Sequence, residues 1–346
     1  MRPAAPRPTI KTLSEMTGFS IATVSKALGN SPVVTEATRA AIIAAAEQVG
    51  YQASLRGRSL RTGKSYQIAV LMPLSVAKSH EWDGVEYAEI LAGIAEGLEG
   101  SPYRIAVHLV RDAADSNAVV RSIVEGHLAD GLIFSGILHD DPRIAYLGER
   151  GFPFVTLGRG HGAGQHAFVD IDSDWAAYAA TRRLIEGGHR RIALVNPDPS
   201  LAYSLDRIAG YSRALAEAGL SPDPALIADG DLTARHGKAA ALALTALTDP
   251  ATGFVCVNES TALGVLSGLH ETGVEVGRKA SVIAYDDINA SAYFWPPLTT
   301  FLYPLETLSR VLAQFMLRLL EGEDPATLSH FVRPGLIIRQ DDRLHP

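Results

Sequence analysis

Cysteine is almost absent from this chain, since Cys256 is the single one among 346 residues. A disulfide framework within the chain is therefore excluded, which suits a reducing compartment. No run of 18 apolar residues occurs, so we expect no membrane span. The N-terminus MRPAAPRPTI lacks the apolar stretch of a secretory signal, and we expect a cytoplasmic protein. The 11 histidines are scattered without metal-ligand spacing, so we predict neither metal nor cofactor.

The motifs of common enzymes are also incomplete. Residues 158–163 (GRGHGA) satisfy the dinucleotide pattern, but a strand rather than a helix is expected after them. Residues 63–65 (GKS) resemble the end of a phosphate-binding loop, but Arg58 stands where that loop needs its first glycine. No G-x-S-x-G elbow occurs. We therefore predict that the protein is not an enzyme.

Positive charge is concentrated at one end of an acidic chain. Residues 1–64 contain nine basic and three acidic side chains, a net charge of +6. The other residues contain 22 basic and 35 acidic side chains, a net charge of −13. A small basic segment on an acidic body is typical of a DNA-binding module attached to another domain, although a solvated basic tail would have the same composition.

The first 62 residues have the pattern of three short helices. Thr9 and Ser20 are suitable N-caps for the first two, Gly18 suits the tight turn between them, and Thr35 and Glu36 begin the third. The first helix carries Ile10, Leu13 and Met16 and the second carries Ile21, Val24 and Leu28 at helical spacing, and we expect Ile42, Ile43, Ala46 and Val49 on the inner face of the third. This spacing predicts a helix-turn-helix, with a generic three-helix bundle as the alternative.

In a helix-turn-helix, the start of the second helix reads DNA. Ile21 and Ala22 would face base edges, with Lys26 one turn later. The hydroxyls of Thr9, Ser20, Thr23 and Ser25 can bond phosphates. Packing of Ile21 in the core is the alternative for that residue.

From about residue 66, apolar runs alternate with amphipathic stretches. Runs at 68–72, 104–110, 131–136 and 153–158 form one series, and after 168–172 a second series follows at 191–196, 226–231, 254–258 and 281–285. This alternation predicts parallel sheets covered by helices, arranged as two Rossmann-like lobes. By pattern alone, segments 299–304, 305–321 and 330–340 could return to either lobe.

The chain resembles the lactose/galactose repressor family. GFSIATVSKAL is close to that family's G-V-S-x-x-T-V-S-R-x-L pattern. GHRRIALVN, RIAGYSRALAEAG, VNESTALGVL, VIAYDD and PPLTT have family counterparts in the same order. The resemblance implies a helix-turn-helix headpiece and a sensor of two Rossmann-like lobes, as in type I periplasmic binding proteins. We expect the headpiece at 1–53, a hinge at 54–65, a first lobe at 66–168 plus about 303–332, and a second lobe at 169–302 plus about 333–346.

The resemblance also implies which residues contact DNA. Ile21, Ala22 and Lys26 fall at the positions that read the major groove, and Leu60 matches a hinge leucine that wedges into the minor groove. The full predicted set is Thr9, Ser20, Ile21, Ala22, Thr23, Ser25, Lys26, Thr38, Arg58 and Leu60. The hinge departs from the family at Ala53, Ser54 and Gly57, and a plain flexible linker is the alternative.

A ligand between the lobes is implied in the same way. Arg207, Asn258, Asp286 and Trp295 match ligand-contacting positions, and Leu74, Ser135 and Arg159 are further candidates. Aspartate, arginine, asparagine and an indole suit a sugar. The alternatives are an interlobe salt bridge between Arg207 and Asp286 and a core position for Trp295. Gly158 stands where several sugar-binding relatives have aspartate, so their sugar specificity does not carry over directly.

These inferences combine into one expected function. A homodimer binds a pseudopalindromic operator as a repressor, and a small-molecule effector, expected to be a carbohydrate, changes its operator affinity. Because no heptad repeat ends the sequence, we expect a dimer rather than a tetramer. An activator or global regulator of the same architecture is the alternative, and a stand-alone sugar-binding protein is a weaker one because no export signal was found.

Overall fold

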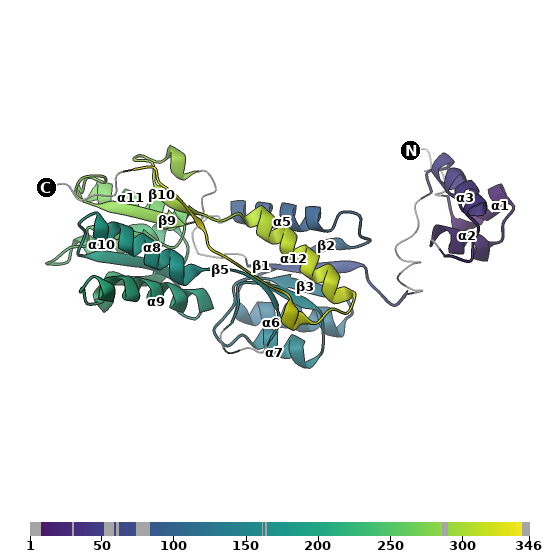
Figure 1. Cartoon of the computed structure of the whole chain (residues 1–346), viewed down its shortest axis with the longest axis horizontal. Coiled ribbons are helices and arrows are strands. Elements are labelled where there is room, and N and C mark those ends of the chain that lie inside the picture. Colours follow the sequence, from purple (N-terminus) through teal and green to yellow (C-terminus); the bar gives the residue numbers. More distant parts are fainter. Residues whose placement is uncertain are drawn as a thin grey trace, which may run out of the picture. The chain divides into compact units, whose positions relative to one another are not determined.

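The computed structural model describes residues 8–29, 31–51, 59, 62–73, 84–160, 162, 165–285 and 290–340. The chain divides into two compact units, Met1–Tyr66 and Gln67–Pro346 (Figure 1). Four residues of the predicted sites, Arg58, Leu60, Leu74 and Asp286, lie outside the described residues.

The first unit contains the helices α1 (Ile10–Thr17), α2 (Ile21–Leu28) and α3 (Glu36–Gln48). The side chains of Thr9, Ser20 and Thr35 accept hydrogen bonds from backbone N–H groups of the first turns, so the predicted caps are confirmed. Gly18 has φ of 71°, a left-handed conformation that costs glycine little and allows the tight turn between α1 and α2.

The core of this unit is narrower than the sequence pattern suggested. Its buried side chains are Leu13, Val24, Ala27, Val34, Ile42 and Ala46. Ile43 is exposed instead, so its predicted position on the inner face is wrong, and Met16 on α1 is also exposed. Ile43 follows Ile42 by about 100° around the helix, and a three-helix core covers one face of each short helix only.

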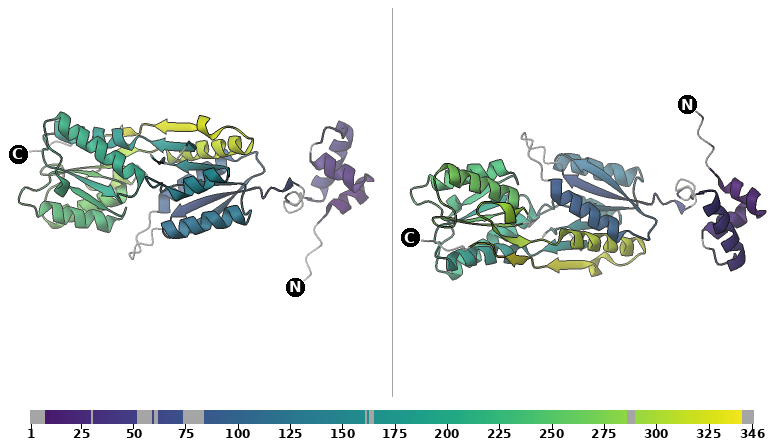
Figure 2. Two further views of the ribbon diagram at one scale, coloured as in Figure 1. Left: turned by 90° about the horizontal axis from the view of Figure 1, so that it is seen from below. Right: turned by 90° about the horizontal axis from the view of Figure 1, so that it is seen from above.

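The second unit contains two lobes, each built on a six-stranded sheet (Figure 2). The first sheet has the order β11-β5-β4-β3-β1-β2, with β1 Gln67–Pro73, β2 Arg104–Val110, β3 Gly131–Phe134, β4 Phe154–Leu157, β5 Ala167–Ile171 and β11 Ser329–Val332. The second has the order β12-β10-β9-β8-β6-β7, with β6 Ile192–Pro197, β7 Ile227–Gly230, β8 Gly253–Cys256, β9 Ser281–Tyr285, β10 Thr299–Leu302 and β12 Gly335–Ile337. Among the strands of the described residues, β12 alone is antiparallel to its neighbour, which agrees with the predicted α/β fold class.

Helices cover both faces of each sheet, which is why the strands read as continuous apolar runs. In the first lobe, α5 (Gly84–Gly97) and α12 (Leu305–Leu320) pack on the face that carries Ile68 and Val70. On the face that carries Ala69 and Leu71 lie α6 (Ala113–Glu125) and α7 (Pro142–Glu149). In the second lobe, α8 (Ser173–Glu186) and α9 (Ala202–Glu217) cover one face, and α10 (Ala234–Thr245) and α11 (Glu259–Glu271) cover the other. Three short 3₁₀ turns, η1 (Pro224–Leu226), η2 (Ser291–Tyr293) and η3 (Pro325–Thr327), lie in the connections.

The chain crosses between the lobes three times. Strand β5 pairs with β4 and β11 along its length, so the first lobe extends to Ile171 and the predicted boundary at 168 was three residues too early. β10 belongs to the second sheet, α12 and β11 return to the first lobe, and β12 ends in the second sheet. Each lobe thus has its own sheet of parallel strands. Folds of this kind bind ligands in the crevice at the carboxyl ends of such strands.

Candidate DNA-binding surface and effector cavity

The exposed face of α2 carries the side chains predicted to read DNA. Ile21 is 50 % exposed, and Ala22 and Lys26 are exposed beside it. Residues 21, 22, 25 and 26 share one face because the helix repeats every 3.6 residues. Val24 and Ala27 face the opposite way into the core. The core alternative for Ile21 is thus excluded, and an exposed apolar residue next to a lysine fits a groove-reading surface.

Two of the predicted phosphate-binding hydroxyls, those of Thr9 and Ser20, cap the N-termini of helices. Ser20 Oγ accepts the N–H of Thr23 at 3.1 Å, and Thr9 Oγ1 accepts the N–H of Thr12 at 3.3 Å. Thr38 bonds with the cap of α3, accepting a hydrogen bond from the Thr35 hydroxyl at 2.9 Å. These hydroxyls are fixed where backbone N–H groups and the helix dipole favour anions.

A cavity of about 600 Å³ lies in the second unit and is lined by both lobes. Four predicted effector-binding residues line it: Ser135 and Arg159 from the first lobe, and Arg207 and Asn258 from the second. The crossover segments also contribute, through residues such as Ile171 and Tyr303. The volume falls within the range of small-molecule sites.

Arg207 is held in place by its own lobe. Its side chain on α9 is 1 % exposed, and Nε donates to Asn196 Oδ1 at 3.2 Å while Nη2 donates to the carbonyl oxygen of Cys256 at 3.1 Å. The guanidinium carbon lies 4.2 Å from the centre of the Tyr285 ring. Neutral oxygens and a ring face orient the guanidinium at the cavity wall without neutralising its charge.

Asn258 has a structural function that our sequence reasoning missed. It caps α11, where Oδ1 accepts the N–H of Thr261 at 2.8 Å, and Nδ2 donates to the carbonyl oxygen of Leu232 at 3.0 Å. The pattern N-x-x-T ahead of an apolar helix was the available signal. An amide has two donor hydrogens, so the capped side chain retains a second one beside the bond to Leu232.

Arg159 forms an ion pair with Asp170, with 3.0 Å between Nε and Oδ2, and its guanidinium carbon lies 4.4 Å from the Phe331 ring centre. Both charged residues line the first-lobe side of the cavity. Arg159 is therefore present at the site as predicted, but with its charge already balanced by Asp170.

Trp295 is not brought to the cavity. Its side chain is 93 % exposed, as is most of Tyr293, whereas Phe294 packs against the core of the second lobe. Phe294 therefore anchors this segment, and its two neighbours point to solvent. Neither the predicted ligand contact of Trp295 nor the core alternative describes its position.

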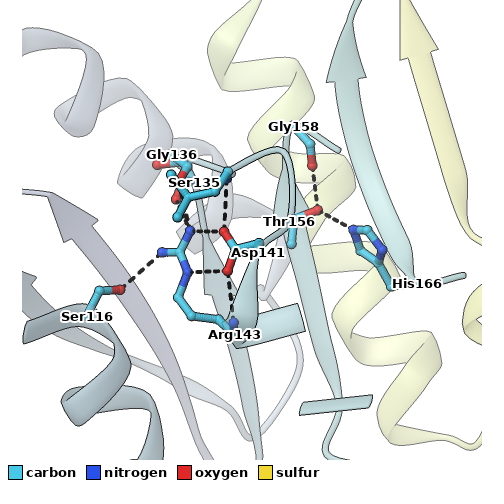
Figure 3. Close-up of polar contacts among 9 residues, drawn as sticks. Ser116, Ser135, Gly136, Asp141, Arg143, Thr156, Gly158 and His166 are labelled. Atoms are coloured by element: carbon cyan, nitrogen blue, oxygen red, sulfur yellow. Dashed lines mark hydrogen bonds and ion pairs between the residues drawn. The ribbon is translucent and has the colours of Figure 1, made fainter. Parts of the chain in front are cut away.

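A buried ion pair at the cavity, Asp141 with Arg143, was also missed by sequence reasoning (Figure 3). Arg143 Nε donates to Asp141 Oδ1 at 2.9 Å, and Nη2 donates to Oδ2 at 2.6 Å. Burial by itself raises the pKa of Asp141, but hydrogen bonds and charge from Arg143 and two backbone amides outweigh it and hold that pKa below its ordinary value. The carboxylate is therefore ionised near neutral pH.

The charges of the cavity wall disfavour an anionic ligand. Among the described residues, its carboxylates are Asp112, Asp141, Asp170, Asp198, Asp206 and Asp231, and its guanidinium groups are Arg111, Arg143, Arg159 and Arg207. Three of these arginines are paired, with Asp115, Asp141 and Asp170. Hydrogen bonds from Ser200 lower the pKa of Asp198, which makes it a charged acceptor for hydroxyl groups.

A helix-turn-helix headpiece and a two-lobed domain with a cavity between its lobes, in one chain, define a class of ligand-responsive regulators. The model of the bacterial regulatory proteins of the lacI family matches residues 9–54, and that of the periplasmic binding protein-like domain matches residues 181–340. The HTH-type transcriptional regulator AglR of Rhizobium meliloti (strain 1021) is 34 % identical over 280 residues, covering 81 % of this chain and 78 % of that one. The chain belongs to the lacI family and is a DNA-binding transcriptional regulator.

Solved structures agree with this fold. The complex of the transcriptional regulator CelR with cellobiose is 27 % identical, has a TM-score of 0.73, and covers 97 % of this chain and 100 % of that one. The Lac repressor dimer bound to operator and the anti-inducer ONPF, 22 % identical, has a TM-score of 0.82 over 98 % of this chain and 100 % of that one. None of the helices in the described part of the chain is long and apolar enough to cross a membrane.

Proposed function

We propose that this regulator is a repressor that binds a pseudopalindromic operator as a homodimer and releases it when a neutral carbohydrate enters the cavity. The cavity carries the proposal: about 600 Å³ in volume, it combines apolar walls with carboxylates, an amide and the guanidinium of Arg207, which has no carboxylate partner among the described residues. Such groups bond hydroxyls in both directions, while the excess of carboxylates disfavours an anionic ligand. The cellobiose bound to CelR supports a sugar as the class of effector.

Exposed apolar side chains support the dimer. Leu263, Tyr293 and Trp295 are exposed on the second lobe, and Val107 and Leu109 are exposed along edge strand β2 of the first. A second copy that covered such side chains would remove apolar area from water. Two headpieces in one dimer would match two operator half-sites, and Leu60 of the hinge would contact the minor groove between them. Such a protein acts in the cytoplasm, where the operator is.

Binding of neutral sugars to the full chain tests the effector. In titration calorimetry with cellobiose, maltose and sucrose, we expect one sugar to bind wild type and Arg207→Ala to bind it about 10- to 100-fold more weakly, the scale of a hydrogen bond to a charged group. Arg191→Ala is the matched control, because Arg191 lies in the same lobe and pairs with Asp223 and Asp249 outside the cavity wall. Equal sugar affinity of wild type and Arg207→Ala would contradict the assignment of this cavity as the effector site. Expression of a reporter gene placed behind the operator, measured with and without the protein, distinguishes repression from activation.

A further inference from the structure

The two lobes are hydrogen-bonded directly to each other at the cavity, between residues 137–139 and residues 200–202. The N–H of Ala202 donates to the carbonyl oxygen of Ile137 at 2.9 Å, and the N–H of His139 donates to that of Ser200 at 3.2 Å. Leu138 and Leu201 face each other between these bonds as an isolated antiparallel bridge. We call this contact the interlobe clasp.

The first-lobe half of the clasp is held from behind by the buried pair Asp141–Arg143 (Figure 3). Arg143 Nη2 donates to the carbonyl oxygen of Gly136 at 2.8 Å, and Asp141 Oδ2 accepts the N–H of Leu138 at 3.0 Å. The carbonyl of Gly136 and the N–H of Leu138 thus bond to the ion pair in the first lobe. The carbonyl of Ile137 and the N–H of His139 bond to the second lobe. The pair therefore satisfies backbone groups of this segment that the second lobe does not, as a neighbouring strand would.

The pair itself is fixed by contacts that do not involve the clasp. Arg143 Nη1 donates to Ser116 Oγ at 3.1 Å on α6, and its guanidinium carbon lies 4.5 Å from the Phe134 ring centre. Asp141 also caps α7 by accepting the N–H of Arg143 at 2.9 Å. The pair is therefore a rigid support for residues 136–138, which follow the end of β3 at Phe134.

We propose that Asp141 and Arg143 are positioning residues that hold the interlobe clasp closed over the cavity, so that a change in lobe orientation has to break it. Both halves line the cavity, through Ile137 and Leu138 on one side and Ser200 to Ala202 on the other. A ligand that touches both halves binds the closed and open arrangements with different affinity, which is what shifts their populations. The role of the clasp in the response to a ligand rests on the proposed effector function. The clasp and its support by Asp141 and Arg143 do not depend on that function.

Hydrogen exchange of the full chain without any sugar tests the support. In wild type we expect the peptide spanning residues 198–204 to be protected. Arg143→Met should speed its exchange about tenfold, the scale of one lost hydrogen bond, although residue 143 lies in the other lobe. The peptide covering β8 reports whether the second lobe remains folded. Unchanged exchange at 198–204 in a folded Arg143→Met protein would overturn the proposal, as would wild-type exchange there as fast as in an unstructured peptide.

Because removing one partner of a buried ion pair can unfold a protein, two further variants keep the test decisive. Asp141→Asn keeps the size and an acceptor oxygen and should speed exchange at 198–204 by about threefold. Ala202→Pro deletes one clasp donor at the first helical position of α9, where proline fits because Leu201 has φ of −76° and ψ of 133°. Exchange of the peptide 136–141 should then rise about tenfold.

Ala234→Pro is the matched control for Ala202→Pro, since Ala234 is the first residue of α10 and Thr233 before it has φ of −90° and ψ of 155°. It should leave both clasp peptides unchanged. If it speeds exchange of 136–141 as much as Ala202→Pro does, the effect is not specific to the clasp and the proposal fails. Since no sugar is present, this outcome is separate from a failure of the carbohydrate titrations.

Discussion

The two apolar residues Ile21 and Val24 differ in solvent exposure although they lie on the same short helix. Val24 is fully buried among α1 and α3, whereas Ile21 is half exposed next to Ala22 and Lys26. Burying Ile21 would stabilise the headpiece, so its exposure is a cost that a contact with a thymine methyl group would offset. Lys26 is then the main polar group of the reading face.

Replacing Lys26 by alanine should weaken binding to a selected operator by about 1–3 kcal/mol and relax the preference at one base pair, as expected for loss of a base contact. Binding is measured by fluorescence anisotropy on a duplex that the full chain selects from a random pool. Lys11→Ala is the control, because Lys11 lies on α1, 3.9 Å from Glu15 in an exposed ion pair. An equal loss in the two variants would indicate only a general effect of charge.

At the scale of elements, helix pairs in the lobes approach closely through glycines. A Cβ on Gly264 of α11 would lie 1.8 Å from the carbonyl oxygen of Ala234 on α10, so any larger residue forces the two helices apart. By contrast, a Cβ on Gly148 of α7 meets nothing within 4 Å. Local sequence gives both residues the same helical preference, and only the partner helix distinguishes them.

Gly264→Ala should therefore destabilise the second lobe by about 1–3 kcal/mol through overpacking. The matched variant Gly148→Ala should be neutral or stabilising by up to about 1 kcal/mol, because alanine favours a helix over glycine. Both are measured by urea unfolding followed by circular dichroism. A stable Gly264→Ala protein would show that the packing of α10 on α11 is looser than described.

At the scale of the whole molecule, opposite charges are divided between the two units. The headpiece and hinge region carries +6 and the remainder −13. Attraction to phosphates is thereby confined to one unit, while the other repels DNA. The charge distribution thus matches the two units, since the basic unit holds the predicted DNA-binding surface and the acidic unit holds the cavity.

A protein consisting of residues 63–346 should lose specific operator binding at any practical concentration and keep the sugar affinity of the full chain. The full chain should bind operator more weakly as salt rises, with a slope proportional to the number of phosphates contacted. Anisotropy titrations between about 50 and 200 mM salt, and calorimetry on the shorter protein, check both. Specific operator binding by residues 63–346 would refute the assignment of DNA reading to the headpiece.

The sequence alone determined the parts that depend on local chemistry. The caps at Thr9, Ser20 and Thr35, the left-handed Gly18 and the alternation of strands and helices follow from short-range rules, and the family pattern placed Arg207 and Asn258 at the cavity. Tertiary structure decided what depends on residues far apart in the chain. Trp295 points to solvent because Phe294 anchors its segment, and Arg143 supports the clasp because β3, α6 and the start of α9 meet there. Burial and partner choice arise only when distant segments pack together, and no local pattern encodes them.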